Sequence, residues 1–273
     1  MVETPNYDGP LPQCQGPKLK PFPHRKSKVD FIRLLSDSES TGGIESGGHA
    51  HVFEVSIEGE TYALKVFKFF DDEEVRAGLN YTRADHSISI DLLHSHSDPF
   101  YNECRAFGQI IQAGQNGRVA VRCYGHLTLP AETEEDLDQR YKLAWDRPAE
   151  DCDKPMSQRQ PFRAIVKELV IDDVPLSQKV VNKMVKDLKK MRALGVYPMD
   201  VCRRNYRAGL LVDMSLAMTE PHYLFGLRSK RHVDDMKRED LANVLQIAKD
   251  GGFTCRVRDD EFCSKIRARE GSF

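Results

Sequence analysis

Four polar residues lie within or next to apolar segments of the sequence. A polar side chain at such a position usually has a bonding partner or a function. Lys65 lies within a strand-like apolar run, and Asp213 directly follows the apolar residues 210–212. Asp200 and Asn205 lie in the irregular stretch before that second run. An ammonium can neutralise a phosphate, a carboxylate can accept a proton, and carboxylate and amide oxygens can hold a metal ion. Taken alone, Lys65 could instead extend its ammonium to solvent, so its meaning depends on the surrounding elements.

Two apolar runs predict a β-hairpin that carries Lys65. They cover residues 52–57 and 62–67, and the Glu58-Gly59 pair between them suits a tight turn. Further along the chain, Asp98-Pro99 suits the cap and first residue of a helix that carries Glu103. We therefore expect Lys65 on a strand and Glu103 on a nearby helix.

A strong helical pattern precedes the loop that holds Asp200 and Asn205. Apolar residues recur at helical spacing from Val181 to Leu194, and Gly195 stands where a left-handed stop residue belongs. A later helix is expected at about residues 234–249. The pattern places the polar loop between two helices.

Two more strands complete the expected sheet. They are predicted at residues 119–123 and 165–170, from alternating or continuous apolar residues. The stretch between them, at about residues 130–161, is polar and acidic and contains the lone Trp145, which we expect to be a local packing anchor.

The order of these elements resembles the protein-kinase fold, from about Ser46 to Ala217. Residues 62–66, Tyr-Ala-Leu-Lys-Val, resemble the Val-Ala-Ile-Lys signature on the third strand of that fold. The resemblance implies that Lys65 neutralises the α- and β-phosphates of ATP and pairs with a helix glutamate. Glu103 is the first candidate for this glutamate, and Glu74 is the second because its charged run is typical of solvated surface.

The segment of residues 194–205 is similar to the kinase catalytic loop His-Arg-Asp-Leu-x-x-x-x-Asn, with Pro and Met in place of His and Arg. The resemblance implies that Asp200 accepts the proton of a substrate hydroxyl and that Asn205 holds a magnesium ion. Asp213 resembles the aspartate of the Asp-Phe-Gly motif, with Met and Ser in place of Phe and Gly. In the family this aspartate is the principal magnesium ligand.

The remaining parts of a nucleotide site resemble the family less closely. Of the three glycines in the phosphate-cradling loop only Gly47 is kept in place, and Gly48 partly compensates. Residues 168–170 resemble the hinge whose backbone holds adenine, and Lys167 stands at the gatekeeper position. The resemblance thus implies ATP and magnesium as cofactors, Asp200 and Lys65 as catalytic residues, Gly47, Gly48, Lys65, Glu103, Glu168 and Val170 as cofactor-binding residues, and Asn205 and Asp213 as metal ligands.

The expected fold is α+β and bilobal, with a small antiparallel sheet in an N-terminal lobe and a reduced helical C-terminal lobe. We expect a leader at residues 1–28 that is either flexible or held against the surface, because this part is rich in proline, lysine and glycine. The N-terminal lobe would cover residues 29–171, including the acidic insert at about 130–161, and the C-terminal lobe would cover residues 172–273.

Two departures separate the chain from an ordinary protein kinase. About sixty residues follow Asp213, too few for the full set of helices that docks a peptide, and no Ala-Pro-Glu motif is evident. Short kinase-like chains of this layout resemble a fungal family related to an inner-kinetochore (Sim complex) subunit. That resemblance implies protein partners and a scaffolding role in the nucleus.

Composition and charge argue against several other classes of function. The formal net charge of −2 argues against direct nucleic-acid binding, although local basic patches occur at residues 228–232 and 265–269. The seven cysteines are scattered and never in a CxxC pair, which favours reduced thiols in the nucleus or cytoplasm, and no stretch approaches membrane-spanning length. The paired histidines at 49/51 and 94/96 lack the converging ligands of a zinc site.

Three functions stay open at this point. The first is an atypical phosphotransferase whose site is formed by five polar residues, Lys65, Glu103, Asp200, Asn205 and Asp213. The second is a pseudokinase scaffold that keeps the shell for partner docking, suggested by the eroded glycine loop and the short C-terminal part. The third is a small-molecule kinase, which suits the missing peptide-docking helices, although such enzymes usually keep a histidine before the catalytic aspartate.

Overall fold

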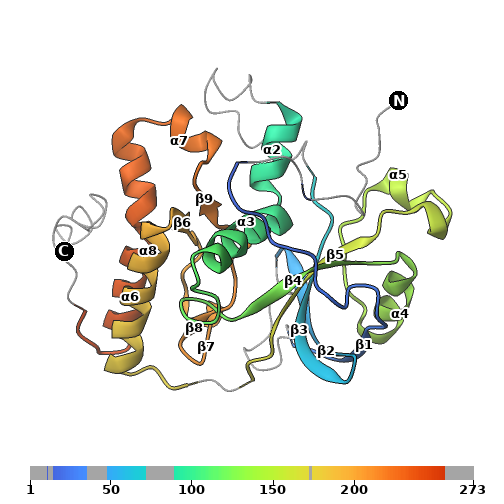
Figure 1. The fold of residues 1–273 in the computed structure, drawn as a ribbon, viewed down its shortest axis with the longest axis horizontal. Coiled ribbons are helices and arrows are strands. Elements are labelled where there is room, and N and C mark those ends of the chain that lie inside the picture. The colour runs from blue at the N-terminus through green and yellow to red at the C-terminus, as the bar shows by residue number, and fades with distance from the viewer. Residues whose placement is uncertain (1–10, 12–14, 36–47, 72–88, 172–173, 256–273) are drawn as a thin grey trace.

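The computed structural model describes residues 11, 15–35, 48–71, 89–171 and 174–255. A five-stranded antiparallel sheet lies on one side of the molecule and the long helices α6 and α8 on the other (Figure 1). The sheet has the order β1-β2-β3-β5-β4. Its strands are β1 (Asp30–Leu34), β2 (Ala50–Ile57), β3 (Glu60–Phe67), β4 (Cys123–Leu129) and β5 (Phe162–Glu168). The α+β class is therefore confirmed.

The β2–β3 hairpin forms where the sequence predicts it. Glu58 and Gly59 connect the strands with φ angles of 52° and 82°, the left-handed conformation that a tight hairpin turn requires. The register pairs Val52 with Lys65 and Val55 with Tyr62. This register fixes which face of the sheet each side chain occupies, because side chains alternate along a strand.

One face of the sheet packs against the acidic insert. This insert forms α4 (Glu132–Tyr141), α5 (Ala149–Cys152) and a short 3-10 helix (Met156–Gln158). Its buried Trp145 lies 4.5 Å from Phe162 between ring centroids, which confirms the expected packing anchor. The insert thus covers an apolar sheet face that would otherwise be exposed.

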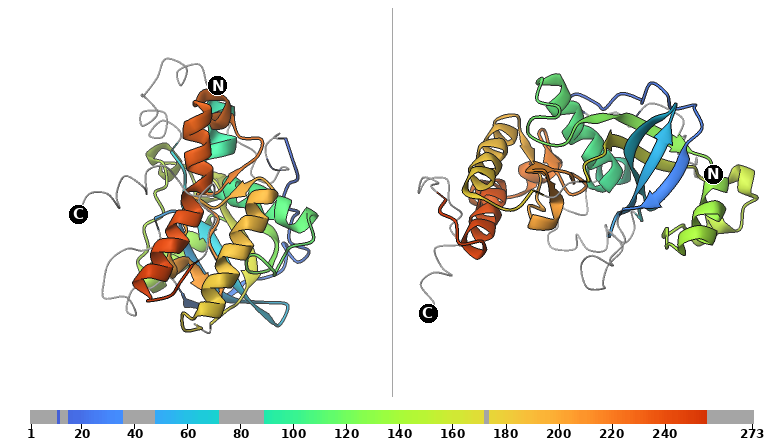
Figure 2. Two further views of the ribbon diagram at one scale, coloured as in Figure 1. Left: turned by 90° about the vertical axis from the view of Figure 1, so that its left-hand side faces the viewer. Right: turned by 90° about the horizontal axis from the view of Figure 1, so that it is seen from below.

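The other face of the sheet packs against α3. Helix α2 (Ile90–Ser97) leads into α3 (Pro99–Gln112), and Asp98 between them accepts a 2.8 Å hydrogen bond from the Phe100 backbone N–H. This cap and the proline that follows it begin α3 where the sequence predicts. Most residues of α3 are buried, because the helix lies between the sheet and the helical part of the molecule (Figures 1 and 2).

The helical part begins with α6 (Gln178–Ala193), and Gly195 follows it with a φ angle of 72°. Helix α8 (Lys230–Asp250) lies beside α6 (Figures 1 and 2). Both helices are close to their expected positions. Between them lie η4 (Arg203–Asn205), α7 (Tyr223–Leu227) and two small two-stranded sheets, which pair β6 (Val196–Tyr197) with β9 (Met218–Thr219) and β7 (Tyr206–Arg207) with β8 (Leu210–Leu211).

One segment differs from the sequence-based expectation, and the structure adds detail to a second. The strand expected at residues 119–123 is wrong: β4 begins at Cys123, and Val121 instead donates a backbone hydrogen bond to Leu211 in the helical part. Within the expected leader, Leu19 and Phe22 are buried. Their segment packs against the fold because glycines on α3 and β4 leave room for its backbone, a feature that composition does not reveal.

No helix among the described residues combines the length and the apolar character that crossing a membrane requires.

Candidate functional site

Lys65 lies at the centre of a buried cluster of charges. Its ammonium donates to Glu103 Oε2 at 2.8 Å and to Asp213 Oδ1 at 2.7 Å. Lys65 is 4% exposed and Glu103 is fully buried, whereas the Asp213 side chain is 32% exposed. The structure therefore brings together three of the residues that the sequence singles out, from a strand, a helix and a loop.

Lys167 is the fourth member of this cluster. Its ammonium contacts the second carboxylate oxygen of Glu103 and donates to the backbone carbonyl of Val212 at 2.8 Å. Two ammonium groups thus face two carboxylates, and the formal charges cancel. We call Lys65, Lys167, Glu103 and Asp213 the ionic cluster.

Strand parity explains why both lysines meet Glu103. In the register of β3 and β5, Lys65 pairs with Ile165, and Lys167 lies two residues further on the same face. That face packs against α3, so its polar side chains must find partners on the helix. A second buried pair on the same face, Arg163 with Asp98, satisfies this requirement at the start of α3.

The charges around Lys65 and Asp213 favour the ionised forms of these two groups. Burial alone would lower the pKa of Lys65, but the charges of Asp213 and Glu103 outweigh it and raise the pKa above its ordinary value. Burial would raise the pKa of Asp213, but the charges of Lys65 and Lys167 and the hydrogen bonds from Lys65 and the Ser215 backbone lower it. Lys65 and Asp213 therefore stabilise each other's charged form.

The loop before β7 holds Asp200 and Asn205 together. The Asn205 amide donates to the Asp200 carboxylate and to its backbone carbonyl, each at 2.9 Å. The Arg204 guanidinium lies 3.3 Å from the same carboxylate. The carboxylate of Asp200 is thus engaged within its own loop.

Asp240 on α8 contacts the residue before Asp200 in this loop. The sequence did not single it out as a site residue. Its carboxylate accepts a 2.9 Å hydrogen bond from the backbone N–H of Met199, whose φ angle of 66° is left-handed. Burial raises the pKa of Asp240 to about 7, and the charges of Glu239 and Asp200 act in the same direction. An aspartate in a helical charge pattern gives no sign of such a contact.

His49 is a further residue of the site that was considered only as a metal ligand. Its ring lies 3.5 Å from the Ser215 hydroxyl, two residues after Asp213. Burial and the charge of Lys65 lower the pKa of His49, while Asp213 and Asp200 oppose this. His49 therefore lies where the segment before β2 approaches both acidic residues.

The other expected site residues are less informative. Gly47 and Glu74 lie outside the described residues. Gly48 is exposed, with no heavy atom within 4 Å of an added Cβ. Glu168 donates its backbone N–H to the Arg122 carbonyl at 2.9 Å, and Val170 packs partly buried against the core.

The residues fit a nucleotide and magnesium only in part. Lys65 suits a phosphate, and oxygens of Asp213 and Asn205 suit a magnesium ion that keeps several waters. Within the described residues, however, no three His, Cys, Asp or Glu side chains gather in a way that could hold a metal ion. The charged groups of the cluster are also already engaged with one another.

The chain matches a known family model over most of its length. The family model for kinetochore Sim4 complex subunit FTA2 matches residues 8–218, which is more than half of the chain. The matched range includes the ionic cluster and the Asp200–Asn205 loop. A search of curated proteins finds no match.

Proposed function

Because the chain belongs to the family of kinetochore Sim4 complex subunits described as FTA2, we propose that it is a subunit of a kinetochore protein complex. It would act in the nucleus through contacts with other proteins rather than by phosphotransfer. A kinase-like, bilobal shell is part of this proposal. The order of the Lys65 strand, the Glu103 helix, the Asp200–Asn205 loop and Asp213 supports it.

The self-contained ionic cluster is the observation that favours a scaffold. In a phosphotransfer site the strand lysine is set against a phosphate and the aspartate against a metal ion. Here Lys167 adds a second ammonium, so that Glu103 and Asp213 neutralise both lysines without a ligand. Such a cluster joins β3, β5, α3 and the loop after β8. It would fix the relative positions of surfaces that partners recognise.

The scaffold proposal is tested by purifying the tagged full chain from cells of its source. We expect kinetochore complex subunits to co-purify with the wild-type chain. We expect the same subunits at the same yield with Asp200→Asn, because the amide can keep the short loop contacts while losing the ability to accept a proton. A wild-type chain that enriches no kinetochore protein would refute the proposal. Selective loss with Asp200→Asn would favour phosphotransfer.

Binding of ATP and magnesium is a second candidate function, and the observation that favours it is the Lys65–Glu103 pair at 2.8 Å. Lys65 would contact phosphate, and Asp213 with Asn205 would face the metal ion. A ligand at a hundred times its Kd adds about 2.7 kcal/mol of stability, which corresponds to a Tm rise of roughly 5–10 °C for a chain of this size. Thermal melts at millimolar ATP with and without magnesium test this candidate. The absence of any magnesium-dependent shift would exclude it.

A further inference from the structure

Residues 17–22 lie along the outer edge of β4, the strand at one end of the sheet. The Phe22 backbone N–H donates to the His126 carbonyl at 2.7 Å, and the His126 N–H donates to the Lys20 carbonyl at 3.2 Å. Pro21 lies opposite His126 in a parallel pairing and has no N–H to present on its outer side. The segment thus closes the edge of the sheet as a short added strand.

Two glycines leave room for the backbone of this segment. An added Cβ at Gly108 on α3 would lie 2.7 Å from the Pro17 carbonyl oxygen, and one at Gly125 on β4 would lie 2.7 Å from the Lys20 carbonyl oxygen. Gly125 also has a φ angle of 141°, which other residues rarely adopt. We call the strip formed by Gly108, Gly125 and His126 the strand track.

Two apolar side chains anchor the segment in different parts of the core. Leu19 is 3% exposed and packs in the cluster that contains Cys104 and Cys123. Phe22 is 2% exposed and packs in the second cluster, where its ring centroid lies 5.5 Å from that of Tyr62. Recognition of the segment therefore combines hydrogen bonds along a sheet edge with two apolar anchors, which is how proteins bind an added strand.

The connection between this segment and β1 is open to solvent. It covers residues 23–29, and none of them is buried. Its backbone forms local turns, in which Arg25 donates to the Phe22 carbonyl at 3.1 Å and Ser27 donates to the His24 carbonyl at 3.0 Å. Because no buried side chain lies in this connection, it can extend and carry residues 17–22 away from their own track.

We propose that the strand track also accepts residues 17–22 of a second copy of this chain, so that two copies exchange these segments. The second copy carries the identical segment, so the edge hydrogen bonds and both apolar anchors form between chains as they form within one. A chain's own segment competes at an effective concentration of about millimolar. The exchanged dimer is therefore a minor form at micromolar protein, and its share rises with concentration.

Two full-chain variants that fail in complementary ways test this exchange. The segment variant, Leu19→Asp with Phe22→Asp, keeps the track but cannot bury its anchors. The track variant, Gly108→Val, keeps the segment but blocks the track. We expect each variant alone to be monomeric by light scattering, and an equal mixture to form a heterodimer at least about tenfold more tightly than the wild type self-associates, because neither half has a competitor within its own chain. A mixture that stays monomeric would overturn the proposal.

A peptide of residues 15–26 shows whether the segment variant still has a working track. We expect the fluorescent peptide to bind this variant in anisotropy measurements, and a peptide with Lys20→Asp to bind equally well, because Lys20 is exposed. A peptide with Leu19→Asp and Phe22→Asp should not bind. If the native peptide binds but the track variant does not, a second copy is not the occupant. If the native peptide does not bind, the track does not recognise the segment and the proposal is wrong.

Native thiols report where the second copy lies. Cys104 is one helical turn before Gly108, and Cys123 is two residues before Gly125 on the same strand face, so both buried thiols adjoin the track. In the segment variant we expect both to be alkylated faster than in the wild type, and the track variant should slow them again. The exposed Cys152 should keep one rate throughout. Equal rates at Cys104 with and without the track variant would place the contact elsewhere.

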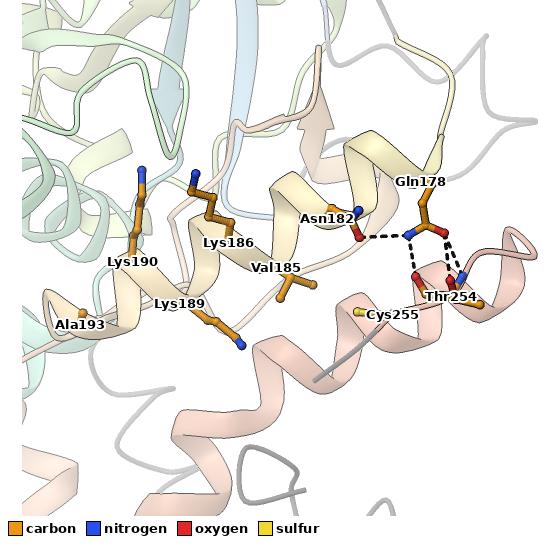
Figure 3. Close-up of a pocket in the computed structure, with 9 residues that line it drawn as sticks. All are labelled: Gln178, Asn182, Val185, Lys186, Lys189, Lys190, Ala193, Thr254 and Cys255. Atoms are coloured by element: carbon orange, nitrogen blue, oxygen red, sulfur yellow. Dashed lines mark hydrogen bonds between the residues drawn. The ribbon is translucent and has the colours of Figure 1, made fainter. Parts of the chain in front are cut away.

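A recess of about 740 Å³ along α6 is a competing surface for self-association (Figure 3). Its apolar lining includes Val185, Ala193 and Cys255. Ala193→Glu introduces a charge there and, placed in both variants, should leave the heterodimer unchanged. Loss of the heterodimer would assign the contact to the recess and overturn the exchange.

The wild-type chain gives the last test. Its dimer fraction should rise with concentration, while the segment variant stays monomeric at the same concentrations. A wild-type chain that remains monomeric at a concentration approaching millimolar would refute the exchange. The proposed function would stand in that case, because co-purification of kinetochore subunits does not depend on pairing of this chain with itself.

Discussion

At the scale of single residues, Glu103 is the carboxylate that binds both lysines of the ionic cluster. It is fully buried and accepts from two ammonium groups, Lys65 and Lys167. Breaking a buried ion pair by removing one partner leaves an uncompensated charge, which typically costs about 3–5 kcal/mol. The residue therefore matters for stability whatever the site binds.

We accordingly expect Glu103→Gln to lower the free energy of unfolding by about 3–5 kcal/mol at neutral pH, measured by urea denaturation. Glu150→Gln makes the same chemical change on an exposed residue and should stay within about 0.5 kcal/mol of the wild type. Similar values for the two variants would show that the ionic cluster does not stabilise the fold.

Asp240 predicts an unusual dependence of stability on pH. Its pKa is raised from 3.8 to about 7 in the folded chain. The contribution of Asp240 to the free energy of unfolding is therefore fully present below pH 3.8 and is lost as the pH rises through 7. Asp240→Asn keeps an acceptor for the Met199 N–H and removes this titration. We expect the Tm of the variant minus the Tm of the wild type to increase as the pH is raised from about 4 to 7. A constant difference across this range would contradict the assignment.

At the scale of elements, the docking of the N-terminal segment depends on α3. An added Cβ at Gly108 would lie 2.7 Å from the Pro17 carbonyl oxygen and 2.8 Å from the Lys18 carbonyl carbon. No real Cβ makes such backbone contacts, so the segment must shift if Gly108 is replaced. Helix α3 thus contributes Glu103 to the ionic cluster and contacts the N-terminal segment through Gly108.

Gly108→Ala should therefore destabilise the protein by about 1–3 kcal/mol and speed trypsin cleavage between Lys18 and Leu19. Gly226→Ala in α7 is the control, because nothing lies within 4 Å of its added Cβ. If both variants are cleaved at the wild-type rate, the segment is not held at Gly108.

At the scale of the whole molecule, Asp213 connects the sheet to the helical part. It lies just after β8 and reaches Lys65 on β3 across 148 positions of sequence. Its pKa is lowered by the two lysines, so the stability it contributes is present above its ordinary value of 3.8 and is lost as the pH falls below it.

Asp213→Asn should consequently melt at a lower temperature than the wild type at pH 7, by several degrees. The difference should shrink steadily as the pH is lowered below about 4, because the wild-type carboxylate then becomes protonated. Differential scanning calorimetry over this range measures both. A difference that grows on acidification would mean that Asp213 is not held ionised by Lys65 and Lys167.

Local sequence determined the elements that hold the site. The β2–β3 hairpin, the Asp98 cap of α3 and the end of α6 at Gly195 follow from turn residues, a capping residue and apolar spacing. These signals act over a few residues and need no tertiary contact. The placement of Lys65 on a strand and of Glu103 on a helix was therefore predictable.

Only the tertiary structure decided how the charges are balanced. That Lys167 shares Glu103 with Lys65 depends on the register of β3 and β5 and on the rotation of α3, neither of which is encoded locally. The contact of Asp240 with Met199 and the burial of Leu19 likewise join distant segments. A buried charge acquires its meaning from its partners, and those partners are set by packing rather than by spacing along the chain.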